Sequence, residues 1–270
     1  MSVECPDTLK WCLDLAGYPY TSRIFLPMSV QRVSLTMNNL QQYDDLASLW
    51  WKDSSPFKDL LYLNAPRFRF FESWLSAWQD KKVLDLGCGG GFVSEELARR
   101  GAQVVGVDPA QSLVDVARQH AQESSLHIDY RVGTGEAIPA PDASFDAVVC
   151  VDVLEHVADL DRVLSEVHRV LKPGGLFLYD TINKTFFSFL WMILVLEWIA
   201  GRIPRGTHDW RKFIKPQLMS AKLKHFGFTD VEQKGIVLSG VRFAAWGLIP
   251  RFGISARQKR GLYVGVARKS

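Results

Sequence analysis

The sequence predicts an α/β fold with a doubly wound, mostly parallel sheet of seven strands, preceded by a helical cap and interrupted by an apolar inserted helix. Three observations predict it. Short apolar runs at 83–86, 103–107 and 147–151 are typical of central parallel strands, which are buried on both faces. A glycine-rich turn follows the first run at 87–91. Helical spacing of apolar residues begins directly after that turn.

The N-terminal part divides into an extension at 1–37, whose role the sequence does not indicate, and a helical cap at 38–80. Within the extension, 8–16 has the spacing of a short amphipathic helix that ends at Gly17. Within the cap, aromatic and apolar residues recur at helical spacing, and the Asn-Ala-Pro sequence at 64–66 predicts the start of a new helix. Arg67 then falls in the first turn of that helix.

The α/β core is expected at 81–185, the apolar insert at 186–215, and a C-terminal helix with closing strands at 216–270. The predicted strands of the core are 83–86, 103–108, 128–132, 147–151 and 176–180, and the predicted helices are 92–101, 112–121 and 160–171. The last helix runs through Phe226. Two closing strands at 231–237 and 262–267 complete the sheet in antiparallel fashion.

The glycine-rich turn carries the clearest functional signal. Gly87, Gly89 and Gly91 allow a close approach of the backbone to an extended polar ligand at a helix N-terminus. Asp108 ends the second strand about 20 residues later, where a carboxylate accepts from the two hydroxyls of a ribose. Asp85 precedes the turn and would repel a pyrophosphate, but it suits a cationic ligand.

The third glycine of a dinucleotide fingerprint is absent, because Phe92 occupies its position. Together with the two aspartates, the turn resembles motif I of class I S-adenosylmethionine (SAM) methyltransferases. In this arrangement the loop with Gly135 and Glu136 borders the adenine. Arg67 either binds the SAM carboxylate from the cap helix or is an ordinary surface arginine.

A second cluster follows the fourth strand. If 152–157 forms the first turn of a helix, Asp152, Glu155 and His156 lie on one face at i, i+3 and i+4. Two carboxylates and an imidazole can bind a divalent cation. His156 alone as a general base is one alternative. A helix-capping aspartate with a histidine satisfied by its neighbours is the other.

The stretch 186–200 is more apolar than an ordinary surface helix, yet its length of about 15 residues is below the ~20 needed to span a bilayer. It predicts a core helix, a wall of a substrate tunnel, or an interfacial membrane anchor. The aromatic residues, with Arg202 and Arg205 beyond one end, favour the anchor. The basic tail with interleaved apolar residues is either a second membrane-facing patch or a solvated face.

Composition excludes several functional classes. The chain has 32 Lys and Arg against 29 Asp and Glu, a balance that does not indicate a nucleic-acid partner. The four cysteines show no metal-type spacing, which favours a reducing cytoplasm. No secretory signal pattern precedes the cap.

Several motifs occur in the order found in the ubiquinone-biosynthesis O-methyltransferases, and this resemblance covers roughly 40–237. They include the glycine turn, the V-L-E-H-V segment at 153–157, T-I-N-K-T at 181–185, G-T-H-D-W at 206–210 and K-F-I at 212–214. The last three are the more specific. The sequence departs from the family at three positions: Asp152 stands where glutamate is usual, Leu61 where histidine is usual, and Ala65 where proline is usual.

The resemblance implies SAM-dependent methylation of a catechol-type hydroxyl on a polyprenylated quinone precursor. It implies SAM contacts at Arg67, Gly87, Asp108 and Val151. It also implies a Mg²⁺ or Zn²⁺ site at Asp152, Glu155 and His156. Further implications are peripheral attachment to the inner face of a membrane through 186–200 and participation in a quinone-biosynthesis complex.

The expected chemistry is the conversion of a phenol into a phenolate by the cation or by His156, with His208 and Asp209 closing the site over the substrate. Two other functions remain open. One is SAM-dependent methylation of a different lipid-like or phenolic acceptor. The other is a SAM-binding, membrane-associated subunit without catalytic activity, against which the intact Asp85, Asp108, Glu155 and His156 argue.

Overall fold

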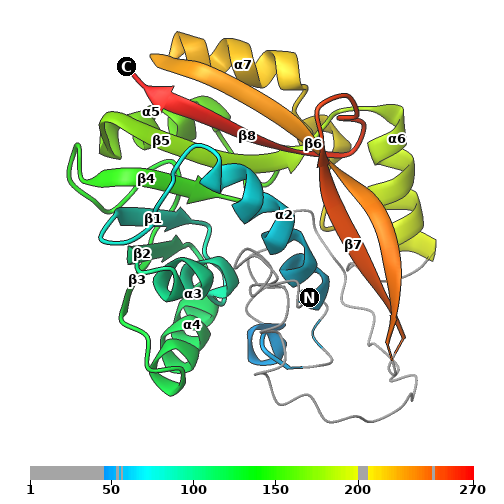
Figure 1. Cartoon of the computed structure of the whole chain (residues 1–270), viewed down its shortest axis with the longest axis horizontal. Helices are drawn as coiled ribbons and strands as arrows, with labels where there is room; N and C mark the ends of the chain where they lie inside the picture. The colour runs from blue at the N-terminus through cyan, green and yellow to red at the C-terminus, as the bar shows by residue number, and fades with distance from the viewer. Residues whose placement is uncertain (1–45, 53–54, 56, 200–205, 245–246) are drawn as a thin grey trace, which may run out of the picture.

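A computed structural model describes residues 46–270 with the exception of 53–54, 56, 200–205 and 245–246. The helix expected at 8–16 and the beginning of the cap lie outside the described residues. The remaining elements form one mixed sheet with helices on both of its faces (Figure 1).

The described chain contains one sheet of eight strands in the order β3-β2-β1-β4-β5-β8-β6-β7. The strands are β1 (Lys82–Leu86), β2 (Gln103–Asp108), β3 (Ile128–Val132), β4 (Phe145–Cys150), β5 (Leu171–Ile182), β6 (Phe228–Ala244), β7 (Gly247–Ser255) and β8 (Leu262–Lys269). The first five are parallel, and β8, β6 and β7 pair antiparallel to their neighbours. The order reverses between β1 and β4, which is where doubly wound sheets bind their ligands.

The predicted number of seven strands is wrong by one, because β7 adds an edge strand. The first half of β6 pairs with β8, and its second half continues into a hairpin with β7. Pro250 lies within β7. A proline makes a sequence look unlike a strand, although an edge strand tolerates one. In Figure 1 this hairpin leaves the sheet as a twisted ribbon beside α2 (Leu61–Glu72).

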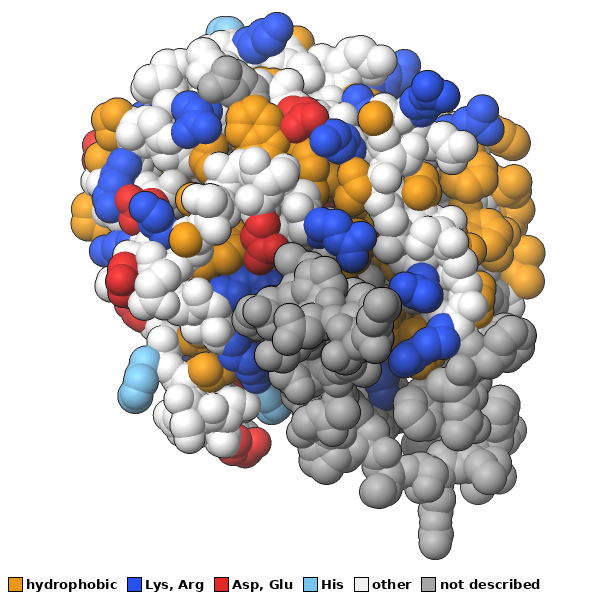
Figure 2. Space-filling view, in the orientation of Figure 1, with side chains coloured by type: hydrophobic (Ala, Val, Ile, Leu, Met, Phe, Trp, Pro, Cys, Tyr) orange, Lys and Arg blue, Asp and Glu red, His pale blue; other side chains and the backbone are white. Residues whose placement is uncertain are grey.

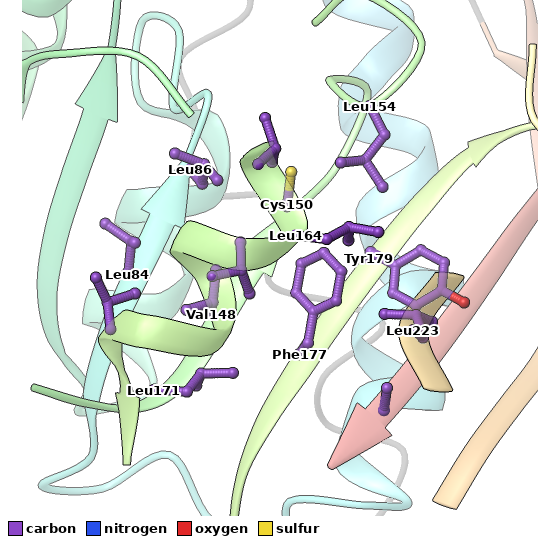
Figure 3. Close-up of a cluster of buried hydrophobic side chains, with 14 of the residues drawn as sticks. Leu84, Leu86, Val148, Cys150, Leu154, Leu164, Leu171, Phe177, Tyr179 and Leu223 are labelled. Atoms are coloured by element: carbon purple, nitrogen blue, oxygen red, sulfur yellow. The ribbon is translucent and has the colours of Figure 1, made fainter. Parts of the chain in front are cut away.

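The core has two layers. On one face of the sheet, α5 (Leu160–Val170) and α7 (Pro216–His225) cover side chains such as Leu84, Val148 and Phe177 (Figure 3). On the other face, α2 and α3 (Phe92–Arg99) cover their strand neighbours Val83 and Val149. Successive side chains of a strand point to opposite faces of the sheet. Because helices cover both faces, consecutive positions must be apolar, which explains the continuous apolar runs in the sequence. A further helix, α4 (Gln111–Glu123), packs against β2 and β3.

The cap differs from its prediction. Helix α2 continues from the 3₁₀ turn η4 (Lys58–Leu60), so it begins before 64–66 and contains Pro66 in its interior. Arg67 therefore lies in the middle of α2 rather than in its first turn. A preceding turn, η3 (Ala47–Leu49), contributes Ala47 to a small cluster with α3 and α4.

The segment 152–157 forms a turn and not the first turn of a helix, because α5 starts only at Leu160 with Asp159 as its N-cap. Asp152 has a left-handed backbone with φ of 58°, which interrupts helical geometry. The i, i+3, i+4 face expected for Asp152, Glu155 and His156 is therefore absent.

The apolar insert forms one continuous helical segment made of α6 (Phe186–Ser188) and the π-type helix η5 (Phe189–Ile199). Thr185 caps it by accepting from the Ser188 backbone N–H. Many of its large apolar side chains face outward, and Figure 2 shows orange side chains gathered at the edge where Figure 1 places this segment. Within the described ranges, no helix combines the length and the hydropathy that crossing a bilayer requires.

Candidate functional site

The loop after β1 adopts a conformation that only glycine supplies easily. Gly87, Gly89 and Gly91 have φ values of 77°, 50° and 98°. A Cβ at Gly87 would lie 2.2 Å from Cγ2 of Val153, so a side chain there would collide with the turn after β4. The predicted glycine turn at the N-terminus of α3 is therefore present.

Asp85 lies beneath this loop and is fully buried. It accepts a hydrogen bond from Ser94 Oγ at 2.5 Å. The pKa of Asp85 is raised to about 7. Burial is the main cause and the nearby Asp108 adds to it, while the hydrogen bond from Ser94 lowers the pKa. A cation bound close to Asp85 would favour the ionised carboxylate.

Asp108 connects the two loops that border the reversal point of the sheet. Its Oδ2 accepts from the Gly89 N–H and its Oδ1 accepts from the Ala110 N–H, both at 2.9 Å. The two bonds fix the plane of the carboxylate at the carboxyl end of β2. A carboxylate in this fixed position suits a pair of ribose hydroxyls.

A small cavity of about 70 Å³ lies beside the glycine loop. Four of the predicted residues line it: Arg67, Gly87, Val151 and Asp152. The ring of Trp50 lies against the loop, because a Cβ added at Gly90 would approach it to 2.4 Å. The Trp50 ring thus forms part of the wall of this cavity.

Arg67 is 1% exposed and pairs with two carboxylates. Its Nε donates to Asp180 and its Nη2 donates to Asp152, each at 2.5 Å. Despite burial, the two carboxylates raise the pKa of Arg67 above its ordinary value. An ordinary surface arginine is excluded.

Asp180 was missed by the sequence reasoning. It lies at the carboxyl end of β5, accepts from the Asp152 N–H at 2.7 Å and is fully buried. An acidic residue near the carboxyl end of a parallel strand is a signal that could have identified it, since all such ends meet at one edge of the sheet.

Gly135 and Glu136 lie in the loop after β3 and contact different parts of the chain around α5. Gly135 packs close to Val163 of α5. The Glu136 carboxylate accepts from the backbone N–H groups of Ala158 and Asp159, at 3.0 and 3.3 Å. The side chain of Glu136 thus stabilises the start of α5, and neither residue lines the cavity beside the glycine loop.

A second group of side chains meets beyond the end of β4. Glu155, His156 and His208 each offer a ligand atom, and these atoms lie within 4.8 Å of one another. Glu155 is 2% exposed and accepts from Thr181 Oγ1 at 2.7 Å. Its pKa is raised by burial and by Asp152. The carboxylate of Asp152 contacts Arg67 and is not a member of this group.

His156 has a pKa lowered to about 3 by burial and by the nearby His208 and Lys212. It is therefore neutral at physiological pH and can act as a base or as a metal ligand. Lys212 Nζ donates to the carbonyls of His156 and Val157, at 3.3 and 3.1 Å. The K-F-I motif thus fixes the turn that carries His156.

The two predicted substrate residues separate in the structure. His208 joins Glu155 and His156. Asp209 instead caps the 3₁₀ turn η6 (Trp210–Lys212) and pairs with Arg211. Arg211 holds the pKa of Asp209 below its usual range.

The comparisons with known proteins identify the family of the chain. A family model described as "Methyltransferase domain" matches residues 84–179. The chain is 41% identical to a ubiquinone biosynthesis O-methyltransferase of Hahella chejuensis over 204 residues, which is 75% of this chain and 85% of the relative. It is 36% identical to one from Ruegeria sp. over 254 residues, or 90% of this chain and the whole of the relative.

Solved structures share the fold at low identity. A SAM-dependent methyltransferase of Thermotoga maritima, described as a possible histamine N-methyltransferase, matches with a TM-score of 0.62 and 16% identity, covering 86% of this chain and the whole of that chain. Magnesium protoporphyrin IX methyltransferase of Synechocystis, solved with bound S-adenosylhomocysteine (SAH), matches with a TM-score of 0.53 and 18% identity, over 86% and 84% of the two chains. The predicted fold class and family are confirmed. This chain is a SAM-dependent methyltransferase, and it belongs to the ubiquinone biosynthesis O-methyltransferase family.

Proposed function

We propose that the protein transfers the methyl group of SAM to a catechol-type hydroxyl of a polyprenylated quinone precursor. The observation that carries the proposal is the position of the Glu155, His156 and His208 group, which adjoins the SAM elements at the carboxyl end of β4. The printed names of the relatives support the same reaction and substrate class.

SAM supplies a methyl group activated by a positively charged sulfur. Asp108 binds its ribose hydroxyls, and the glycine loop admits its backbone contacts. Arg67 and Asp152 lie side by side in the cavity wall and complement the zwitterionic amino-acid end, with the guanidinium toward the carboxylate and Asp152 toward the ammonium. Asp152, which has this role in the assignment, stands where the family usually has glutamate.

The second group of side chains acts on the acceptor. A phenol with a pKa near ~10 is mostly protonated at neutral pH. His156 is neutral and can accept the phenolic proton, but the burial that lowers its pKa to about 3 opposes this transfer and favours the route through a cation. A Mg²⁺ or Zn²⁺ ion held by Glu155 and His156 would lower the pKa of a bound phenol instead.

A turnover assay tests the reaction. The protein is incubated with SAM and a catechol bearing a short prenyl tail, and the methylated product is measured by mass spectrometry together with a fatty acid and a simple phenol as competing acceptors. Preferential O-methylation of the prenylated catechol supports the proposal. Preferential methylation of another lipid-like acceptor refutes this substrate class, and SAM binding without turnover on any acceptor would support a non-catalytic subunit.

SAM affinity is expected to rise with pH through the pKa of Asp85. In the free protein that pKa is about 7, and a bound sulfonium lowers it because the ionised carboxylate attracts the cation. Binding therefore releases a proton, and the dissociation constant measured by calorimetry should fall by up to about tenfold between pH 6 and pH 8.

SAH provides the matched ligand, because it has the same amino and carboxyl groups but a neutral sulfur. Its pH profile should be flatter than that of SAM, and Asp85→Asn should make the two profiles parallel. A wild-type difference between SAM and SAH that persists in Asp85→Asn would contradict the assignment to Asp85.

We also propose that 186–200 attaches the protein to the inner surface of a membrane, where a prenylated substrate resides. The outward side chains of α6 and η5 include three phenylalanines and two tryptophans. Phe186 is 76% exposed and Ile199 is 73% exposed. An apolar face of this kind suits the interfacial layer of a bilayer.

Trp191→Glu combined with Leu194→Glu should weaken binding to anionic phosphatidylglycerol vesicles at least tenfold in a flotation assay, since each side chain loses apolar burial of about 1.5–3 kcal/mol. Leu218→Glu on α7 is the matched control, because Leu218 is 50% exposed outside this segment. Equal flotation of all three proteins, or a wild type that stays unbound, would contradict membrane attachment through this helix.

A further inference from the structure

Glu197 is the one acidic residue of the apolar helix η5, and it is 1% exposed. Its carboxylate accepts three hydrogen bonds from the loop that follows the insert. The donors are the Gly206 N–H at 2.9 Å, the His208 N–H at 3.1 Å and His208 Nδ1 at 2.7 Å. A carboxylate buried in an apolar helix is costly unless it is paired, so this arrangement indicates a specific role.

The contact with Glu197 fixes the imidazole of His208. Nδ1 carries the proton that Glu197 accepts, which leaves Nε2 as the nitrogen with a free electron pair. The ring of His208 lies 5.3 Å from that of His156, centroid to centroid. It also packs edge-on against the buried Phe213. The orientation of His208 is therefore set from two sides.

We infer that His208 Nε2 is a protein ligand of a divalent cation, together with Glu155 and His156, and that Glu197 is the positioning residue that orients His208 for this role. The inference deepens the proposed function, on which it rests. It replaces Asp152 by His208 in the ligand set, because Asp152 is bound to Arg67 while the other three side chains converge within 4.8 Å.

The ligand set also selects the ion. Two imidazoles and one carboxylate suit Zn²⁺, Co²⁺ or Mn²⁺, whereas Mg²⁺ prefers oxygen ligands and bound water. A histidine ligand that donates its other ring nitrogen to a carboxylate is the usual arrangement of such sites. Glu197 and His208 form this pair.

The pair of Glu197 and His208 connects the apolar helix η5 with the group of side chains next to the SAM elements. Glu197 belongs to the helix whose outer face carries the exposed aromatic residues, while His208 faces the group of side chains next to the SAM elements. A change in the position of η5 therefore displaces a metal ligand directly. Glu197 is the carboxylate that accepts a hydrogen bond from the His208 ring.

Cobalt binding to the untagged full-length protein tests the inference. Co²⁺ gives ligand-field absorption bands whose intensity reports the ligand set, and Zn²⁺ competition gives the affinity. His208→Ala should reduce Co²⁺ affinity more than tenfold and change the band intensity. Glu197→Gln should reduce affinity about 10–100-fold. Asp152→Asn should change Co²⁺ affinity far less than His208→Ala does, and the surface variant His225→Ala should leave affinity and band intensity unchanged.

SAM calorimetry and circular dichroism on each variant separate this inference from the proposed function and from misfolding. Retained SAM binding with lost Co²⁺ binding in His208→Ala supports the inference. Co²⁺ binding that depends on Asp152 and not on His208 overturns the ligand set but leaves the metal mechanism intact. A wild type that binds no Co²⁺ and methylates the prenylated catechol in chelator overturns the inference and leaves the methyltransferase with His156 as base.

Discussion

An Arg67→Met variant should lose about 3–5 kcal/mol of its free energy of unfolding, measured by urea denaturation at pH 7. Methionine retains much of the aliphatic volume but none of the charge. The change leaves Asp180 and Asp152 without the guanidinium that donates to both at 2.5 Å. Burial raises the pKa of Asp180 to about 8 although Arg67 lowers it, so without Arg67 this carboxyl must take up a proton or remain as an unpaired buried charge, and this is the main cost. SAM affinity should fall as well, since Arg67 lines the cavity.

Arg69→Met is the matched control, because Arg69 belongs to the same helix but is exposed. Its effect should stay within about 0.5 kcal/mol. The double variant Arg67→Met, Asp180→Asn should recover part of the lost stability, since asparagine can still accept from the Asp152 N–H. Equal destabilisation by Arg67→Met and Arg69→Met would show that the buried ion pairs contribute nothing measurable.

Local sequence patterns were sufficient for the parallel core. The strands predicted at 103–108 and 128–132 coincide with β2 and β3, and the others differ from the observed ends by a few residues. The central strands β2 and β4 are almost wholly buried, so their runs are largely apolar, whereas β3 lies at the edge of the sheet and is only partly buried. The glycine turn and Asp108 were predictable for the same reason, because their roles follow from adjacent backbone geometry.

Features set by distant contacts were not predictable. The turn at 152–157 has helical sequence spacing, but the pairing of Asp152 with Arg67 and Asp180 gives it a left-handed residue instead. Helix α2 passes through Pro66 because tertiary packing buries that residue. The strand β7 depends on a partner, β6, whose length the sequence does not reveal.

The structure does not bring Asp152 together with Glu155 and His156, and the reason is similar. Glu155 and His156 are neighbours in the sequence, so their proximity was evident. His208 joins them only because Glu197 and Phe213 hold its ring and Lys212 fixes the turn that carries His156. The contact of Lys212 with His156 joins positions 56 residues apart, and that of Glu197 with His208 joins positions 11 residues apart, so no periodicity in the sequence encodes them.

His156→Gln should lower kcat on the prenylated catechol by about 10²–10⁴-fold, because both routes to the phenolate depend on this imidazole. As a base, it accepts the proton; as a ligand, it holds the cation that lowers the phenol's pKa. Because the pKa of His156 is about 3, its imidazole is uncharged at pH 7. Replacing it with glutamine therefore does not change the charge of the site. The dissociation constant of SAM should therefore change little.

A more acidic acceptor distinguishes loss of phenolate formation from general damage. A nitro-substituted catechol is largely ionised at pH 8 without assistance, so His156→Gln should slow its methylation far less than that of the prenylated catechol. His168→Gln is the matched control, because His168 lies on α5 against Phe228 and outside the group of Glu155, His156 and His208. If His156→Gln slows both acceptors equally, or slows neither by more than tenfold, His156 does not act on the phenolic proton, and the geometry that unites it with Glu155 and His208 must serve binding alone.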